Sequence, residues 1–535
     1  MKSFIAAVAA LALSSPALGQ APVVQAPSGS VQGTREGEMR VFKGIPYAVP
    51  PVDGMRWRPP APMQPWKGVR AATDFGPACV QPQGKTPSVY SPAEPLAVSE
   101  DCLTLNIWAP ANAKKAPVFF WIHGGALTTG SSREAMYDGK RLAEQGIIVV
   151  SINYRLGVLG WLAHPALSLE SPQKVSGNYG LLDQMAALAW VKHNIAAFGG
   201  DPANVTIAGE SAGGLSVMFL MQSPLARATF SKAIAQSAYM VAMPELKQSA
   251  YGAPSAEAVG QMLGAGMQAP DLAALRGLDA QMLTDGAAKL GYFPFGVVDG
   301  LVLPEQMVAT FDKGKQAPVP LLAGFNQGEI RSLMVLAPKA PDSAADYEKV
   351  IRERYGEFAD AFLRLYPAAN YKESILATTR DALYGWTSER LARKQTALGQ
   401  PAYLYLFDHG YPAMETAGLH AFHASELPYV FGTFDGTPPR WPKVPESDRP
   451  LSDAMMGYWA RFAKDGGAGP GWPAYGEQRN YMHFADMPQA KTRLMPGMYE
   501  QYEAVVCRRR AAGIAWNWNV GLASPRLPAK TTGCD

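Results

Sequence analysis

The 535-residue sequence lacks the features of a nucleic-acid-binding or membrane-spanning protein. Its formal charge is only +3 and 17% of its residues are charged, so it has no excess of basic side chains to neutralise phosphates. No apolar run after the N-terminus reaches the roughly 18–20 residues that a membrane helix needs. The sequence also has no internal repeat and no long linker. These absences leave a large, compact protein, and we expect residues 20–535 to form a single domain.

The N-terminus has the pattern of a cleaved signal peptide. Lys2 supplies a positive charge, residues 4–13 form an apolar run too short to span a bilayer, and residues 17–19 are small or apolar, as a peptidase site requires. We therefore predict a signal peptide over residues 1–19. The mature protein would then be exported, either to a periplasm or to the medium.

Cysteine is scarce, with four residues in the chain. An exported protein meets oxidising conditions, under which cysteines pair, and four cysteines allow three pairings. We favour the short-range pairing, Cys79 with Cys102 and Cys507 with Cys534, because each bond would close a polar loop that contains Pro or Gly. Free buried thiols are the alternative.

Three apolar runs in the middle of the chain predict buried strands. They cover residues 117–122, 146–153 and 205–209, and a segment with helical spacing of apolar residues lies between the second and third, over 181–198. Continuous runs rich in β-branched residues suit parallel strands covered on both faces. Residues 318–322 and 402–407 look like later strands of the same sheet. The alternation of strand and helix predicts an α/β protein with a doubly wound sheet.

Residues 209–213, Gly-Glu-Ser-Ala-Gly, match the G-x-S-x-G pattern of a nucleophile elbow. The motif alone is weak evidence, but here it follows a predicted strand and precedes an apolar helical stretch over 215–221, which is the setting the elbow requires. Ser211 is the predicted nucleophile. A serine hydroxyl has a high pKa, so it needs a histidine base that is oriented by a carboxylate.

A second glycine-rich segment, residues 123–126 (His-Gly-Gly-Ala), ends the strand over 117–122. Small residues there would let backbone N–H groups approach a developing oxyanion. An ordinary glycine turn is the alternative. We expect Glu210, beside the nucleophile, to be a buried and hydrogen-bonded support.

Together these segments resemble the type-B carboxylesterase family, which includes the cholinesterases and has the α/β-hydrolase fold, a large and mostly parallel central sheet flanked by helices. The resemblance covers almost the whole mature chain. Besides the elbow, it rests on five blocks in the family's order: residues 42–48, 100–108, 153–155, 177–184 and 198–202.

The resemblance implies a Ser-Glu-His triad in which Glu329 is the acid and His423 is the base. Glu329 follows the predicted strand over 318–323, although its flanking residues, Gly328 and Ile330, differ from the family's usual Asp-Glu-Gly. Asp299 and Asp408 are rival acids. His423 precedes residues 424–432, which resemble the segment after the family's catalytic histidine. His420 is the rival base, and we expect the other histidines to be structural: His123, His164, His193, His409 and His483.

The backbone N–H groups of Gly125, Ala126 and Ala212 are the implied oxyanion donors. Ala126 stands where the family has a third glycine, which would strain the loop if the position needs a positive φ. The resemblance also assigns the Cys79–Cys102 pair, which would close a loop beside the active-site gorge. In cholinesterases that loop contains a tryptophan, whereas Tyr90 is the only aromatic residue here, so choline esters are poor candidate substrates.

The resemblance implies a serine carboxylesterase that forms an acyl-enzyme and acts on a small-molecule ester without a cofactor, as a monomer or weak oligomer. No histidine pair has the spacing of a metal site such as H-E-x-x-H. Two alternatives stay open. The same triad could act mainly on amides, lactones or lipids, or the chain could be a non-catalytic binding module, as in family members that have lost the serine.

Overall fold

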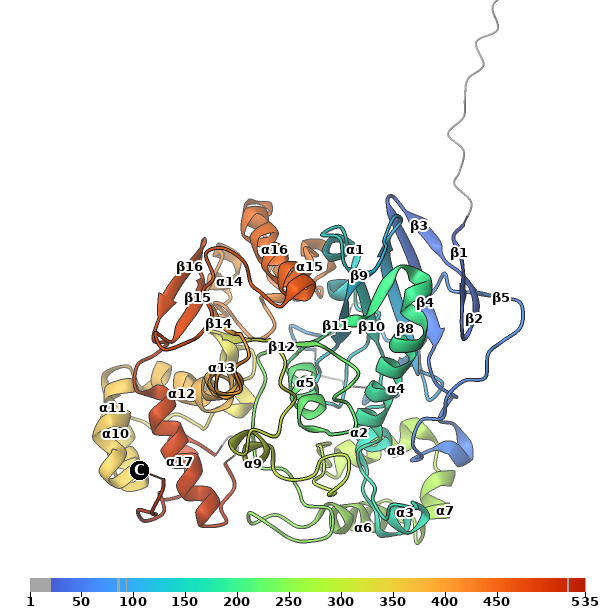
Figure 1. Cartoon of the computed structure of the whole chain (residues 1–535). Coiled ribbons are helices and arrows are strands. Elements are labelled where there is room, and N and C mark those ends of the chain that lie inside the picture. The colour runs from blue at the N-terminus through green and yellow to red at the C-terminus, as the bar shows by residue number, and fades with distance from the viewer. Residues whose placement is uncertain (1–20, 84–86, 93, 517–518, 535) are drawn as a thin grey trace, which may run out of the picture.

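A computed structural model describes residues 21–83, 87–92, 94–516 and 519–534. The predicted signal peptide lies outside the described residues. The main sheet has eleven strands in the order β16-β15-β14-β13-β12-β11-β9-β10-β8-β4-β3 (Figure 1). Its strands are β3 (Thr34–Glu36), β4 (Met39–Pro46), β8 (Thr104–Pro110), β9 (Ala116–Ile122), β10 (Ile148–Ile152), β11 (Gly200–Glu210), β12 (Lys232–Gln236), β13 (Leu321–Asn326), β14 (Ala402–Phe407), β15 (Asn480–Phe484) and β16 (Pro488–Thr492).

The seven neighbouring strands β15-β14-β13-β12-β11-β9-β10 pair in parallel. The pairs outside them, β16 with β15 at one edge and β10 with β8, β8 with β4 and β4 with β3 at the other, are antiparallel. Two small sheets lie apart from the main one, β1 (Val23–Ala26) with β2 (Gly29–Gln32) and β5 (Val69–Ala71), and β6 (Ala78–Cys79) with β7 (Val98–Ser99). The predicted mostly parallel sheet is therefore present.

Strand β9 shows why the apolar runs are continuous. Phe120 and Ile122 belong to the core on one face of the sheet, whereas Phe119 and Trp121 belong to the core on the other face. All four side chains are fully buried. Because successive side chains of a strand point to opposite faces, a strand covered on both sides must be apolar at every position.

Helices cover both faces. Figure 1 shows α1, α15 and α16 on one side of the sheet and α4, α5 and α13 on the other. The helices are α1 (Lys140–Ala143), α2 (Gly157–Trp161), α3 (Pro165–Glu170), α4 (Tyr179–Asn194), α5 (Ala212–Gln222), α6 (Ala256–Gly266), α7 (Leu272–Gly277), α8 (Ala280–Lys289), α9 (Met307–Asp312), α10 (Ala344–Tyr355), α11 (Ala359–Leu365), α12 (Tyr371–Arg380), α13 (Trp386–Ala397), α14 (Pro412–Thr416), α15 (Leu427–Phe431), α16 (Arg449–Asp465) and α17 (Met498–Ala511).

Two predicted strand boundaries were wrong. The strand expected from residue 318 begins at Leu321, because Pro318 and Pro320 have no N–H to give to a ladder. The strand expected from residue 205 begins at Gly200, and its pairing with β9 shifts register between Gly200 and Val205. The segment predicted as a helix over 181–198 divides into α4 and a short 3-10 helix (Ile195–Phe198).

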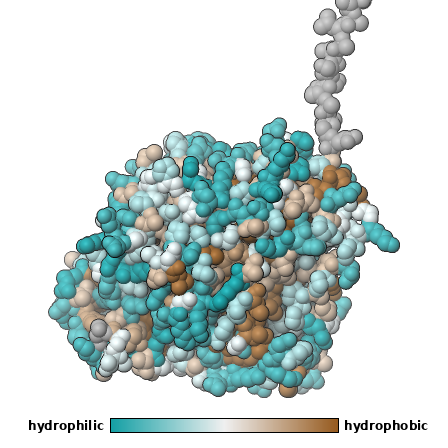
Figure 2. Space-filling view, viewed as in Figure 1, coloured by the Kyte–Doolittle hydropathy of each residue, from teal (hydrophilic) through white to brown (hydrophobic). Residues whose placement is uncertain are grey.

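Both disulfides have the predicted pairing, Cys79 with Cys102 and Cys507 with Cys534. In the described part of the chain no helix is long and apolar enough to cross a membrane. The face seen in Figure 2 is largely hydrophilic, and apolar side chains gather in its lower middle.

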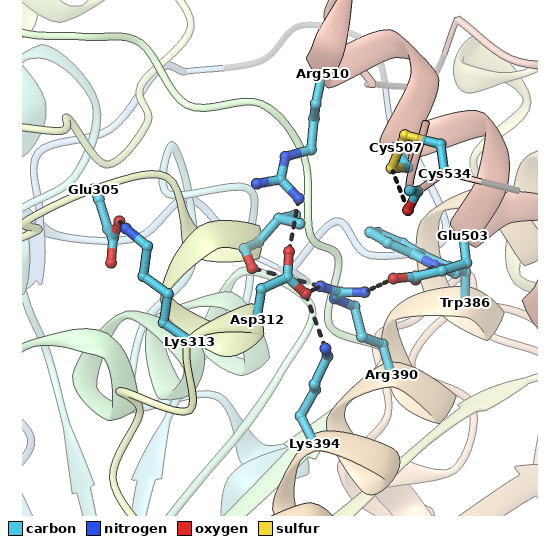
Figure 3. Close-up of polar contacts among 12 residues, drawn as sticks. Glu305, Asp312, Lys313, Trp386, Arg390, Lys394, Glu503, Cys507, Arg510 and Cys534 are labelled. Atoms are coloured by element: carbon cyan, nitrogen blue, oxygen red, sulfur yellow. Dashed lines mark hydrogen bonds and ion pairs between the residues drawn. A yellow bond between two sulfur atoms is a disulfide. The ribbon is translucent and has the colours of Figure 1, made fainter. Parts of the chain in front are cut away.

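The C-terminal helix α17 is attached to helices α9 and α13 through an ion-pair cluster that Figure 3 shows. Arg390 of α13 lies between the carboxylates of Asp312, at the end of α9, and Glu503 of α17. Arg510 of α17 also pairs with Asp312 at 2.7 Å, and Lys394 does so at 2.9 Å. The Arg390 side chain is fully buried, so its charge depends on these partners in place of water.

We expect Arg390→Met to lower the free energy of unfolding by about 2–3 kcal/mol, because two carboxylates lose a buried partner. Arg352→Met is the matched control, since Arg352 pairs with Glu348 and Asp360 on an exposed surface, where ion pairs contribute little. Thermal unfolding of both variants measures the difference. Equal melting temperatures for both variants would contradict a stabilising role for the cluster.

Candidate active site

Ser211 lies at the junction between strand β11 and helix α5, as the elbow motif predicts. Its backbone is left-handed, with φ 57° and ψ −122°, a conformation that costs energy for a non-glycine residue. The flanking glycines make the turn sterically feasible. A Cβ atom on Gly213 would lie 2.0 Å from the Ile122 carbonyl oxygen, and one on Gly209 would lie 2.4 Å from the Gly213 carbonyl carbon. The sharp turn leaves Ser211 partly exposed.

The loop after β9 lies directly against this elbow. A Cβ atom on Gly124 would lie 3.2 Å from the Cβ of Ser211. Gly125 and Ala126 both have positive φ angles, 99° and 55°. A glycine adopts such angles without strain, whereas the alanine at position 126 is strained by about 1–2 kcal/mol. Among the described residues, none accepts a hydrogen bond from the N–H groups of Gly125, Ala126 or Ala212. Ala212 is the first residue of α5, where such a group has no partner within the helix.

The structure brings Glu329 and His423 into direct contact. Glu329 begins a 3-10 helix (Glu329–Arg331) just after β13 and is fully buried. Its Oε2 accepts a hydrogen bond from Nδ1 of His423, and its Oε1 accepts one from the backbone N–H of Asn326 at 2.8 Å. Because Nδ1 is the donor, the other ring nitrogen, Nε2, is free to act as a base.

Nε2 of His423 faces the elbow. It lies 3.1 Å from Oε1 of Glu210, the residue before Ser211. The described contacts include no hydrogen bond between the Ser211 hydroxyl and His423. The expectation that Glu210 is held by hydrogen bonds was wrong for Oε1, which accepts none from the described residues. Glu210 is instead a buried carboxyl group whose Oε1 lies beside Nε2 of His423.

Burial and charge shift the pKa values of both groups. Burial raises the pKa of Glu210 well above its ordinary value, although the nearby imidazole opposes this. Burial alone would lower the pKa of His423, but the carboxyl groups of Glu210 and Glu329 outweigh it and raise that pKa. The protonation states of the two groups are therefore coupled.

The rival residues have other partners. Asp299 accepts hydrogen bonds from the backbone N–H groups of residues 301–303 and from Asn178, so it organises a turn. Asp408 pairs with His420 and His483, at 2.8 and 2.9 Å. His420 thus bonds to Asp408 and not to Glu329.

The other histidines are used locally. His123 is buried in the loop after β9, and burial lowers its pKa to about 4. The side chain of His164 caps α3. His409 bonds to Asp448 at 2.8 Å. His193 is exposed on the last turn of α4.

Sequence reasoning missed the groups that support the acid and the base. Glu426 is fully buried and accepts hydrogen bonds from Gln236 at 2.9 Å and from Asn326 at 2.6 Å. Tyr90, in the Cys79–Cys102 loop, donates to the His423 carbonyl at 3.0 Å. The ring centroid of Tyr384 lies 5.4 Å from that of His423. The signal that could have indicated Glu426 is its place three residues after His423, inside the block that resembles the family.

Comparison with known proteins shows the family to which the chain belongs. Residues 20–501 match the model of the carboxylesterase family. Fumonisin B1 esterase from Sphingopyxis macrogoltabida is 38% identical over 85% of this chain and 85% of its own length. Para-nitrobenzyl esterase from Bacillus subtilis is 35% identical over 85% of this chain and 93% of its own.

A solved structure of a PNB esterase is also similar, with a TM-score of 0.77 and 32% identity over 90% of this chain and 99% of its own. The fold predicted from the sequence is therefore confirmed. The chain belongs to the carboxylesterase family and is a carboxylic ester hydrolase with an α/β-hydrolase fold.

Proposed function

We propose that ester hydrolysis proceeds through a triad of Ser211, His423 and Glu329 and an acyl-enzyme intermediate. The observation that supports this most directly is the buried hydrogen bond from His423 Nδ1 to Glu329, which fixes the imidazole with Nε2 toward the elbow. Nε2 accepts the Ser211 proton as the hydroxyl oxygen attacks the ester carbonyl. The same nitrogen then gives this proton to the departing alcohol, and water repeats the sequence on the acyl-enzyme.

We assign the oxyanion hole to the N–H groups of Gly125, Ala126 and Ala212. The first two come from the loop after β9 and the third from the start of α5, and the two elements meet at Gly124 and Ser211. Fixed donors at this place stabilise the negative charge that develops on the carbonyl oxygen, and one such donor typically contributes about 10²–10³-fold in rate.

The protein acts, in this proposal, as an exported enzyme whose residues 20–535 form one catalytic domain. Its two disulfides support export, because such bonds persist in oxidising compartments. All the groups proposed for the chemistry come from one chain, so a monomer suffices. The substrate is a small-molecule ester.

We expect Ser211→Ala to lower kcat for p-nitrophenyl acetate by at least about 10³-fold, because the nucleophile is lost while the oxyanion donors stay. Ser223→Ala is the control, since Ser223 caps the far end of α5 and we expect it to keep wild-type activity. Labelling with a fluorophosphonate probe, followed by mass spectrometry, locates the modified residue. Full activity in the Ser211 variant would refute the triad.

A second prediction concerns Glu210. The base must be neutral to accept a proton, and the Glu210 carboxyl group favours protonated His423. Glu210→Gln removes that carboxyl group, so His423 loses its proton at lower pH. We therefore expect the acidic limb of the kcat/KM profile to move down by about one pH unit.

The control for this experiment is Glu134→Gln. Glu134 is also a buried carboxyl group, with its pKa raised to about 7 by burial, but it accepts a hydrogen bond from the Ser131 backbone and should produce a much smaller shift. An unchanged or upward-shifted limb in Glu210→Gln would show that Glu210 does not raise the pKa of His423.

A further inference from the structure

The loop that contains His423 also contains a second histidine, His420, which pairs with two carboxylates. This histidine loop, residues 417–426, joins α14 to α15. Two of its non-glycine residues are left-handed, His420 with φ 46° and Ala424 with φ 68°, one on each side of His423. Backbone of this kind persists only where surrounding contacts impose it. The contacts at His420 therefore bear on where His423 lies.

The histidine loop is hydrogen-bonded to the segment that contains Glu329. The Gly328 N–H donates to the Ala421 carbonyl at 2.7 Å, and the Asn326 side chain donates to the Phe422 carbonyl at 2.8 Å. The two residues between His420 and His423 thus make the bonds that bring the acid and the base together. A change in the backbone at His420 would alter these bonds first.

Both ring nitrogens of His420 face carboxylates. Nε2 lies 2.8 Å from Oδ1 of Asp408, and Nδ1 pairs with Glu415 of α14. Only a protonated imidazole can donate to both at once. The bond to Asp408 and the second carboxylate raise the pKa of His420, although partial burial opposes this.

Asp408 connects His420 to the edge of the sheet, where α14 lies beside β14 and β15 (Figure 1). Its other oxygen bonds to Nε2 of His483 in β15 at 2.9 Å. Lys491 of β16 contacts Nδ1 of His483 at 2.8 Å. The backbone N–H of Asp408 also donates to the Phe484 carbonyl at 2.7 Å. Three strands therefore support one side of His420.

Solvent can reach this network. His420, Asp408 and Glu415 line a cavity of about 500 Å³, together with Gly328. The other charged groups that line it are Arg331, Glu373 and Arg380. The His420 side chain is 29% exposed, compared with 7% for His423. His420 can therefore exchange its proton with solvent in this cavity, which His423 does not line.

We propose that His420, in its protonated form, is a positioning residue for the catalytic base: it holds the left-handed backbone at the start of the histidine loop through Asp408 and Glu415 and thereby places His423 against Glu329. This rests on the function proposed above. When His420 loses its proton, one of its two carboxylate contacts becomes repulsive and the loop is released. The positioning effect is present at low and neutral pH and is lost as pH rises through the raised pKa.

The test uses three variants of the full-length enzyme. His420→Asn removes both ion pairs but keeps a residue that tolerates a left-handed backbone. His420→Arg keeps a permanent positive charge with donors for both carboxylates. His409→Gln is the control, because His409 also bonds to an aspartate, Asp448, but has no contact with residues 417–426 among those described.

We expect His420→Asn to lower kcat for p-nitrophenyl acetate by about tenfold with little change in KM, because a small displacement of a catalytic group is costly. We expect the wild-type kcat to decline at alkaline pH, and His420→Arg should restore most of the rate and remove that decline. His409→Gln should match the wild type. Rates are normalised to the active sites counted by fluorophosphonate labelling, so that poor folding does not lower them.

The outcomes separate the two proposals. The positioning role is refuted if His420→Asn has the same normalised kcat and the same pH profile as the wild type, with His409→Gln also active. The triad is unaffected by that result. The same holds if His420→Arg is no better than His420→Asn. If Ser211→Ala is as active as the wild type, the triad itself fails.

Discussion

The contact between Glu329 and His423 is the constraint on which the site depends. The two residues are 94 positions apart and come from loops that follow neighbouring parallel strands, β13 and β14. Parallel strands bring their carboxyl ends to one edge of a sheet, so residues distant along the chain meet there. β11, which ends at Glu210, belongs to the same parallel set. The sheet topology thereby brings the segments that contain the proposed nucleophile, acid and base to one edge.

The site has an unusual concentration of buried carboxyl groups. Glu210, Glu329 and Glu426 are each at most 3% exposed and surround one imidazole. Burial of a carboxylate costs free energy unless hydrogen bonds or an opposite charge compensate. Glu329 and Glu426 have such hydrogen bonds, whereas Glu210 depends on His423. The protonation of His423, the proposed base, is therefore linked to Glu210. Glu210 is also the residue that precedes Ser211 in the chain.

The sequence predicted the central strands well and the edges poorly. The run ending at Ile122 and the strand Ala402–Phe407 were visible because burial on both faces demands an apolar side chain at every position. The antiparallel edge strands have mixed polar and apolar residues, as in β16, which is mostly partly exposed or exposed, and no short pattern marks them. The proline at position 320 was an overlooked signal, since it excludes ladder pairing there.

Ser211 is a candidate nucleophile from a local motif, whereas Glu329 and His423 came from resemblance, and their contact could be seen only in the fold. The supports Asn326 and Tyr90 could not be predicted, because each acts through a partner that is distant in sequence. The cluster around Arg390 was missed for the same reason. Short sequence patterns indicate helices and strands, whereas polar contacts between loops depend on which loops the strand order brings together.

The Cys79–Cys102 disulfide links catalysis to the compartment in which the chain folds. Tyr90, within the loop that it closes, donates to the His423 carbonyl. In the proposed function, an enzyme produced where thiols stay reduced would lack this covalent tether on the loop that contains Tyr90. In the proposed function, oxidative folding would thereby support activity as well as durability.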